Sequence, residues 1–194
     1  MTSLVPYQAE YIDLALQWNI LRFGGPYTLK SGRQSPYFFN AGLFNSGMKL
    51  QKMAECYANR IVDSGVEFDV LFNRKEAKTH GEGGNLIGAP LKGRVLVIDD
   101  VITAGTAINE AVDIINAQED AKLVGVVIAL DRQERASDDT TESAITQVEK
   151  RLGIKVYSVV TLEQIIKHME STRGDAARAD IESMRAYRER YGSS

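Results

Sequence analysis

The chain has 194 residues, a length that fits one domain with a sizeable core. Its net charge of −3 is spread without a long run of one sign, which argues against a nucleic-acid-binding surface. A single cysteine, Cys56, excludes an internal disulfide framework and a metal site built from several cysteines. The amino terminus lacks a basic and then apolar signal pattern, and no apolar run approaches the roughly 18 residues of a membrane span. We therefore expect a cytoplasmic protein that binds neither nucleic acid nor membrane.

The first third of the chain predicts a helix, two short strands and a second helix. The first helix covers about Tyr7 to Trp18, and the strand-like pieces lie around Tyr27–Leu29 and Tyr37–Asn40. The second helix follows a polar turn at residues 45–47 and contains Cys56. Its apolar positions repeat at helical spacing: Leu50, Met53, Ala54, Tyr57 and Ile61.

Strands and helices then alternate as far as Val160. Four apolar segments predict strands: Phe68–Phe72, Arg94–Ile98, Leu123–Leu130 and Lys155–Val160. Helices are expected to begin at Thr106 and near Ser143, and Leu162 to Tyr191 is expected to be helical and mostly charged. His168 lies on a polar face of that last pattern, which predicts a surface position. The alternation indicates an α/β fold with a mainly parallel sheet.

The most informative segment runs from Val95 to Ala107. It starts as an apolar strand, continues with two adjacent carboxylates, Asp99 and Asp100, and ends in a turn of small and hydroxyl residues before a helix. The free N–H groups and the dipole at such a helix start suit a phosphate, and Gly105 allows close approach of the backbone. The carboxylates would repel a phosphate but can accept hydrogen bonds from sugar hydroxyls. The segment therefore predicts a site for a phosphorylated ribose; an ordinary turn with a capping threonine is the alternative.

Five segments together resemble the orotate phosphoribosyltransferases, which belong to the type I phosphoribosyltransferases. The segment just described is similar to the loop that binds 5-phosphoribosyl diphosphate (PRPP) in that family. The other four occur in the family's order along nearly the whole chain: Tyr27–Gly32, Ser35–Asn40, Asn73–Gly84 and Leu130–Arg135. The resemblance implies an α/β type I phosphoribosyltransferase fold in one domain of residues 1–194. Within it, residues 1–45 would form a hood with base-binding elements, 46–160 the α/β core and 161–194 the carboxyl-terminal helices.

The resemblance also assigns roles to residues. It implies that PRPP is bound by Asp99, Asp100, Val101, Ile102, Thr103, Ala104, Gly105, Thr106 and Ala107. It implies that orotate is bound by Lys30, Phe38, Phe39, Thr103 and Arg132. It places the catalytic side chains at Lys78, Lys75, Arg74, His80 and Lys30. Arg74, Lys75, Lys78 and His80 precede three glycines, a pattern that fits a closing loop that carries positive charge to an anionic substrate, although a solvated charged loop is the plainer interpretation.

Plainer interpretations also exist on the base side. Lys30 could be an ordinary surface lysine, and one of the adjacent Phe38 and Phe39 could simply pack in the core, because neighbouring strand residues point to opposite faces. The planar guanidinium of Arg132 emerges at a strand end and matches a planar carboxylate. An ion pair with Asp131 or Glu134 is the alternative for that arginine.

The implied reaction converts orotate and PRPP into orotidine 5′-monophosphate and diphosphate. The expected partners are orotate, PRPP and diphosphate, with Mg²⁺ held mainly through substrate oxygens and by no dedicated protein site. The lid of residues 74–84 would act on the neighbouring subunit of a homodimer. Catalysis would come mostly from orientation and from electrostatic stabilisation of the leaving diphosphate.

One departure from the family pattern lies between Phe72 and Arg94. The 21 residues that separate them show no helical pattern, although parallel strands need a crossover, which is usually helical. In the family, a diphosphate-binding loop, a helix and a strand precede the equivalent of Asn73, so about one βα unit, on the ~30-residue scale of such modules, is absent here. The expected consequence is weak diphosphate binding and low activity. The alternative function is therefore a catalytically impaired form that acts only as a PRPP-binding or dimerisation module.

Overall fold

The computed structural model describes residues 4–72, 90–103 and 105–193, and within these ranges it contains a four-stranded parallel sheet. The strands are β3 (Val70–Phe72), β4 (Gly93–Asp99), β5 (Ala121–Asp131) and β6 (Lys155–Thr161), and they lie in that order across the sheet. Each neighbouring pair is parallel. The expected α/β fold with a parallel sheet is confirmed.

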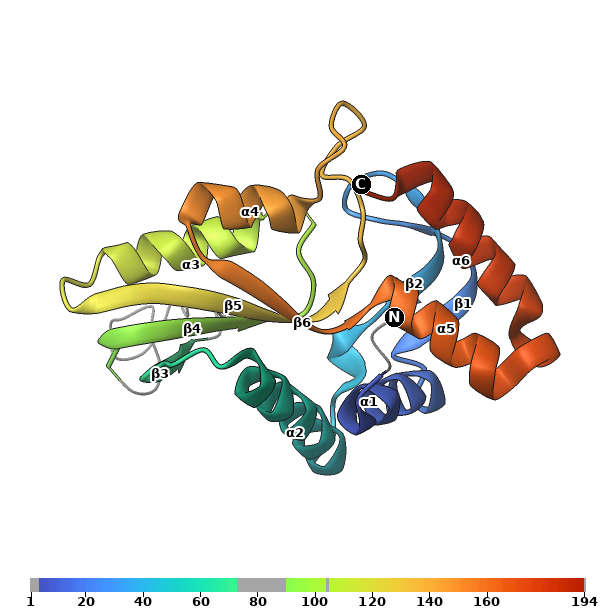
Figure 1. Cartoon of the computed structure of the whole chain (residues 1–194), viewed down its shortest axis with the longest axis horizontal. Coiled ribbons are helices and arrows are strands. Elements are labelled where there is room, and N and C mark those ends of the chain that lie inside the picture. Colours follow the sequence, from blue (N-terminus) through green and yellow to red (C-terminus); the bar gives the residue numbers. More distant parts are fainter. Residues whose placement is uncertain (1–3, 73–89, 104, 194) are drawn as a thin grey trace.

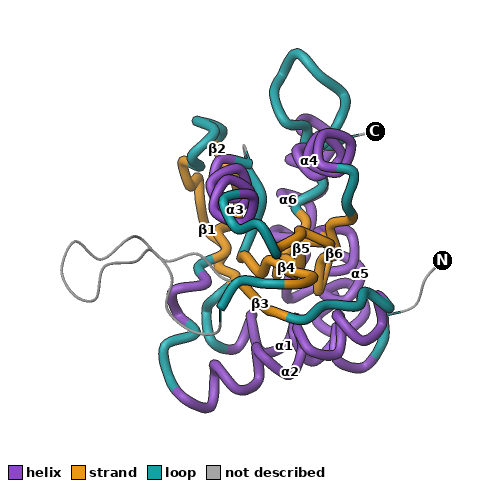
Figure 2. The backbone as a smooth tube through the Cα atoms, turned by 90° about the vertical axis from the view of Figure 1, so that its left-hand side faces the viewer, coloured by secondary structure: helices purple, strands orange, loops and turns teal. Residues whose placement is uncertain are grey.

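Helices cover both faces of this sheet (Figure 1). In Figure 2, α3 (Thr106–Asn116) and α4 (Ala144–Leu152) lie above the strands, whereas α1 (Pro6–Gln17) and α2 (Gly47–Ser64) lie below them. The side chains of β4 alternate accordingly. Val95 and Val97 pack with Ile108 of α3, whereas Leu96 packs with Ile61 of α2.

A second, two-stranded sheet lies beyond the carboxyl ends of the parallel strands (Figure 1). It is an antiparallel hairpin of β1 (Leu21–Thr28) and β2 (Gln34–Phe39), followed by a short 3₁₀ turn, Ala41–Leu43. The largest apolar cluster joins this hairpin to α1 and to the carboxyl-terminal helices α5 (Leu162–Arg173) and α6 (Arg178–Tyr191). The hairpin is therefore fixed to the sheet by a shared core and can take part in a common site.

Local sequence signals account for several helix ends. The hydroxyl groups of Ser46, Ser143 and Thr161 accept hydrogen bonds from backbone N–H groups in the first turns of α2, α4 and α5. Gly65 and Gly153 end α2 and α4 in the left-handed conformation. The predicted elements are all present with shifted ends, and the predicted carboxyl-terminal helix is two helices separated by the 3₁₀ turn Gly174–Ala177.

The prediction for His168 was wrong. His168 is only 7% exposed, and its Nε2 lies 2.7 Å from Asp13 Oδ1 of α1. Its partner in α1 lies 155 residues earlier in the chain, so local periodicity gives no sign of this contact. Among the described residues, no helix is long and apolar enough to cross a membrane.

Candidate functional site

A cavity of about 1090 Å³ lies where the carboxyl ends of β4 and β5 face the β1–β2 hairpin. Ligands of open α/β sheets bind at this edge. Every predicted site residue that the structure describes lines this one cavity: Lys30, Phe38, Phe39, Asp99, Asp100, Val101, Ile102, Thr103, Gly105, Thr106, Ala107 and Arg132. The other predicted residues, Ala104 and Arg74, Lys75, Lys78 and His80 of the lid, lie outside the described residues.

The two carboxylates at the end of β4 are held by the backbone around them. Asp100 N–H donates to Asp99 Oδ1 at 2.8 Å, and Val101 N–H donates to Asp100 Oδ1 at 2.7 Å. The backbone carbonyl of Asp100 accepts hydrogen bonds from Ala129 and Leu130 of β5. Both carboxylates are thereby fixed at the cavity edge while retaining oxygen atoms that can accept from a sugar.

The charge of Asp99 is balanced by its surroundings. Burial raises the pKa of Asp99, and the charge of the neighbouring Asp100 carboxylate adds to the rise. The hydrogen bond from the Asp100 backbone N–H and the positive charge of Lys30 oppose it. Lys30 is an exposed residue in the turn between β1 and β2. The hairpin thus brings a cation towards the acidic end of the sheet, which suits a ligand with both anionic and hydroxyl groups.

The start of α3 is shaped by Gly105. This residue has φ +72°, and it precedes the first residue of the helix, Thr106. Among the described residues, no side chain caps the helix start, so the first N–H groups remain available to a ligand. Gly105, Thr106 and Ala107 all border the cavity. The geometry can hold an anion such as a phosphate at this end of the cavity.

The base side of the cavity is formed by the hairpin. Phe38 and Phe39 are both partly buried, pack against the main apolar cluster and still line the cavity. The ring of Phe38 lies 5.7 Å from that of Tyr27. Tyr37, also in β2, is fully buried in the same cluster. Phe38 and Phe39 thus give the cavity an aromatic wall, and an aromatic face suits a planar ring.

Arg132 forms an ion pair and also borders the cavity. Its Nε donates to Glu134 Oε1 at 2.7 Å, so the ion pair with Glu134 exists. Its Nη2 donates a hydrogen bond to Ser35 Oγ at 3.4 Å, and its guanidinium lies 4.9 Å from the centre of the Tyr37 ring. The residue also borders the cavity. Its terminal amino groups can therefore meet a carboxylate while Nε is held by Glu134.

Sequence reasoning missed two residues that support this site. Tyr57 of α2 donates from its hydroxyl to the backbone carbonyl of Asp99 at 2.7 Å, and its helical spacing had indicated only a core position. Arg33 in the hairpin turn borders the cavity, although it stands outside the matched segments. The sequence around a single arginine between two matched segments does not indicate that it contacts residues about 100 positions later in the chain.

Known proteins resemble this chain in sequence and in structure. A protein of Klebsiella pneumoniae (strain 342) named orotate phosphoribosyltransferase is 49% identical over 216 aligned residues, which cover 96% of this chain and 99% of that protein. A solved orotate phosphoribosyltransferase from Francisella tularensis has a TM-score of 0.81 and 34% identity, covering 99% of this chain and 100% of its own. The Mycobacterium tuberculosis orotate phosphoribosyltransferase solved with PRPP shares the fold, with a TM-score of 0.57, 19% identity and coverage of 82% of this chain and 99% of its own. No family model matches the chain.

Proposed function

The chain belongs to the orotate phosphoribosyltransferase family, and we propose that it transfers the 5-phosphoribosyl group of PRPP to orotate. The products are orotidine 5′-monophosphate and diphosphate, in the de novo synthesis of UMP. The observation that carries this proposal is the shared cavity, in which the helix start and carboxylates of the β4–α3 segment face the aromatic wall and Arg132.

Within this proposal each end of the cavity has one task. The N–H groups from Gly105 to Ala107 hold the 5′-phosphate, and Asp99 and Asp100 accept hydrogen bonds from the ribose hydroxyls. Phe38 and Phe39 flank the pyrimidine, Lys30 and Thr103 contact it, and Arg132 binds its carboxylate. Because the anomeric C–N bond forms as the diphosphate leaves, rate enhancement comes from holding the two substrates in line and from positive charge at the leaving group.

Magnesium fits this cavity as part of the substrate complex. Mg²⁺ prefers oxygen ligands and is commonly held by one or two carboxylates together with substrate phosphates. Asp99 and Asp100 are adjacent carboxylates at the cavity edge, and the described residues contain no cluster of three or more metal-binding side chains. When bound, the ion would neutralise charge on the diphosphate.

The proposal extends to the assembly and to the lid. The resemblance supports a homodimer in the cytoplasm, in which Arg74, Lys75, Lys78 and His80 of one subunit neutralise the leaving diphosphate in the other. These four roles rest on the sequence alone. Lys30, which the cavity does contain, is proposed to contact both orotate and the diphosphate.

A second candidate is a weakly active or inactive PRPP-binding or dimerisation module. The alignment with the Klebsiella protein spans 216 positions, which exceeds the 194 residues of this chain by 22, so that relative contains at least that many residues without a counterpart here. This difference favours the absence of a βα unit between Phe72 and Asn73. In the described residues β3 forms the edge of the sheet, with Leu71 47% exposed.

Turnover separates the two candidates. Protein of verified intact mass is incubated with orotate, PRPP and Mg²⁺, and orotidine 5′-monophosphate is quantified by chromatography. The proposed enzyme forms this product, at a lower rate than the Klebsiella relative measured beside it. A chain that binds PRPP but forms no product would be the binding module.

A further inference from the structure

The carboxylate of Glu134 lies between two arginines from different parts of the fold. Its Oε1 accepts a hydrogen bond from Arg132 Nε at 2.7 Å, and its Oε2 lies 3.6 Å from Arg33 Nη1. All three side chains are nearly buried, with 12% of Arg132, 13% of Glu134 and 9% of Arg33 exposed. Little water reaches this cluster, so removing the carboxylate would leave the nearly buried Arg132 charge without its ion-pair partner.

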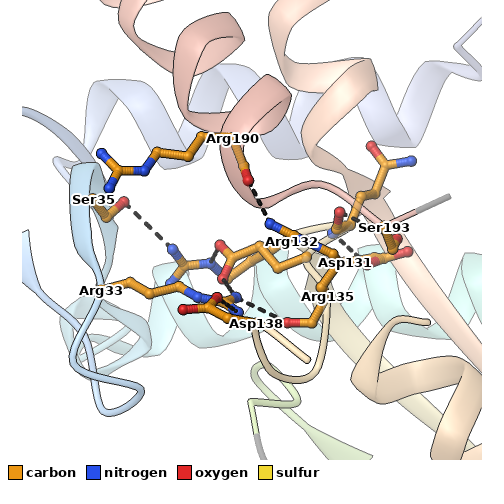
Figure 3. Close-up of polar contacts among 10 residues, drawn as sticks. Arg33, Ser35, Asp131, Arg132, Arg135, Asp138, Arg190 and Ser193 are labelled. Atoms are coloured by element: carbon orange, nitrogen blue, oxygen red, sulfur yellow. Dashed lines mark hydrogen bonds and ion pairs between the residues drawn. The ribbon is translucent and has the colours of Figure 1, made fainter. Parts of the chain in front are cut away.

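Arg33 is itself fixed on the hairpin side (Figure 3). Its Nη1 donates to the backbone carbonyl of Arg135 at 2.8 Å, and its Nη2 donates to Asp138 Oδ1 at 2.8 Å. Its guanidinium lies 4.9 Å from the centre of the Tyr191 ring. The Glu134 carboxylate is therefore held by a rigid partner rather than by a mobile surface side chain.

The backbone between Arg132 and Glu134 is held in an unusual conformation. Gln133 has φ +54°, a left-handed conformation that is strained for a residue with a side chain. This bend brings the side chains of Arg132 and Glu134 together. It is secured by Asp131 Oδ1, which accepts from Gln133 N at 2.7 Å, and by Gln133 Oε1, which accepts from the N–H of Glu163 at 2.9 Å.

The carboxyl-terminal end of the chain supports the same bend (Figure 3). Ser193 N–H donates to the backbone carbonyl of Gln133 at 2.9 Å, and Arg135 N–H donates to that of Tyr191 at 2.9 Å. Arg135 Nη2 donates to the backbone carbonyl of Arg190 at 2.6 Å. The bend thus connects the end of β5 with the end of α6, whereas an unsupported residue would relax out of this conformation.

We propose that Glu134 is the positioning residue for Arg132. It holds Nε of Arg132 so that the terminal amino groups are directed to the carboxylate of the pyrimidine, and Arg33 and the carboxyl-terminal residues 190–193 keep Glu134 in place. This inference rests on the proposed function, because it needs Arg132 to bind that carboxylate. Glu134 touches no substrate in this arrangement; it acts through Arg132.

The test measures discrimination between two nucleotides that differ at the carboxylate. Orotidine 5′-monophosphate carries the carboxylate and uridine 5′-monophosphate lacks it, so the ratio of their dissociation constants reports what the carboxylate contributes to binding. Calorimetry on the full chain gives this ratio for the wild type, Glu134→Gln, Glu134→Asp and a control, Glu170→Gln. Glu170 pairs with Arg185 between α5 and α6, away from the cavity.

We expect Glu134→Gln to lower the preference for the carboxylate-bearing nucleotide by about tenfold, the value of one charge-assisted hydrogen bond, and to leave binding of the other nucleotide within about twofold. Glu134→Asp keeps the charge and restores part of the preference, which also covers the case in which Glu134→Gln does not fold. Glu170→Gln behaves like the wild type. An unchanged preference in folded Glu134→Gln and Glu134→Asp overturns the inference. A wild type that does not discriminate overturns the contact of Arg132 in the proposed function, and the positioning role with it.

Discussion

Replacing Gly105 by alanine tests the phosphate end of the cavity. Gly105 has φ +72°, a conformation that costs a residue with a Cβ about 1–2 kcal/mol. An added Cβ would also lie 3.3 Å from Val148 Cγ2 of α4, a contact so close that either that side chain or the start of α3 must shift slightly. For a chain of this length, that loss in the free energy of unfolding should lower the melting temperature by about 2–8 °C.

The displacement should also weaken PRPP binding. The N–H groups after Gly105 are proposed to hold the 5′-phosphate, and loss of one charge-assisted hydrogen bond corresponds to an affinity about tenfold lower. Gly153→Ala is the matched control, because Gly153 has φ +65° at the end of α4 and no described atom lies within 4 Å of an added Cβ. It should lose similar stability and bind PRPP like the wild type.

The assay combines thermal denaturation with calorimetric titration of PRPP in the presence of Mg²⁺. Wild-type PRPP affinity in Gly105→Ala, together with the expected loss of stability, would refute the assignment of the phosphate to the start of α3. Equal PRPP losses in Gly105→Ala and Gly153→Ala would show that the effect comes from general destabilisation.

Further changes test other parts of the account. Asp99→Asn and Asp100→Asn should each weaken PRPP binding about tenfold in calorimetry, because each removes a charged acceptor for ribose hydroxyls; full affinity in both would contradict that role. Lys78→Ala should lower kcat more than it raises the KM for PRPP, since leaving-group charge grows towards the transition state; a change confined to KM would contradict it. Insertion of the Klebsiella protein's extra segment after Phe72 should raise turnover and the melting temperature, and equal values in the short chain would show the segment to be dispensable. His168→Ala should lower the free energy of unfolding in urea by about 1 kcal/mol, because it removes a partly buried hydrogen bond to Asp13 of α1; an unchanged midpoint would show that this contact contributes nothing.

Periodicity and turn residues were sufficient to predict the sheet and the strand–turn–helix segment that we propose holds the phosphate. The apolar strand, the paired carboxylates and Gly105 lie within one continuous segment, so their spatial relation follows from a strand, a turn and a helix. The predicted contacts of Lys30 and Arg132 came from the family resemblance, and the fold brings both residues to the same cavity.

The supporting contacts could not be predicted because they join distant parts of the chain. Glu134 pairs with Arg33 about 100 positions earlier, and His168 meets Asp13 across 155 positions. The local sequence around each of these residues fits an ordinary surface position. Their contacts depend on tertiary packing, which covers the side chains of Arg33, Glu134 and His168.

The most direct test of the central claim is a comparison of orotate, uracil, adenine and hypoxanthine as acceptors with PRPP and Mg²⁺. Nucleotide formation is measured by chromatography on protein of verified mass. The account predicts that orotidine 5′-monophosphate forms, slowly compared with the Klebsiella relative, and that the bases without a carboxylate give no nucleotide above the enzyme-free control. Transfer to any of those three bases at a rate comparable to orotate, or no transfer to orotate at all, would contradict it.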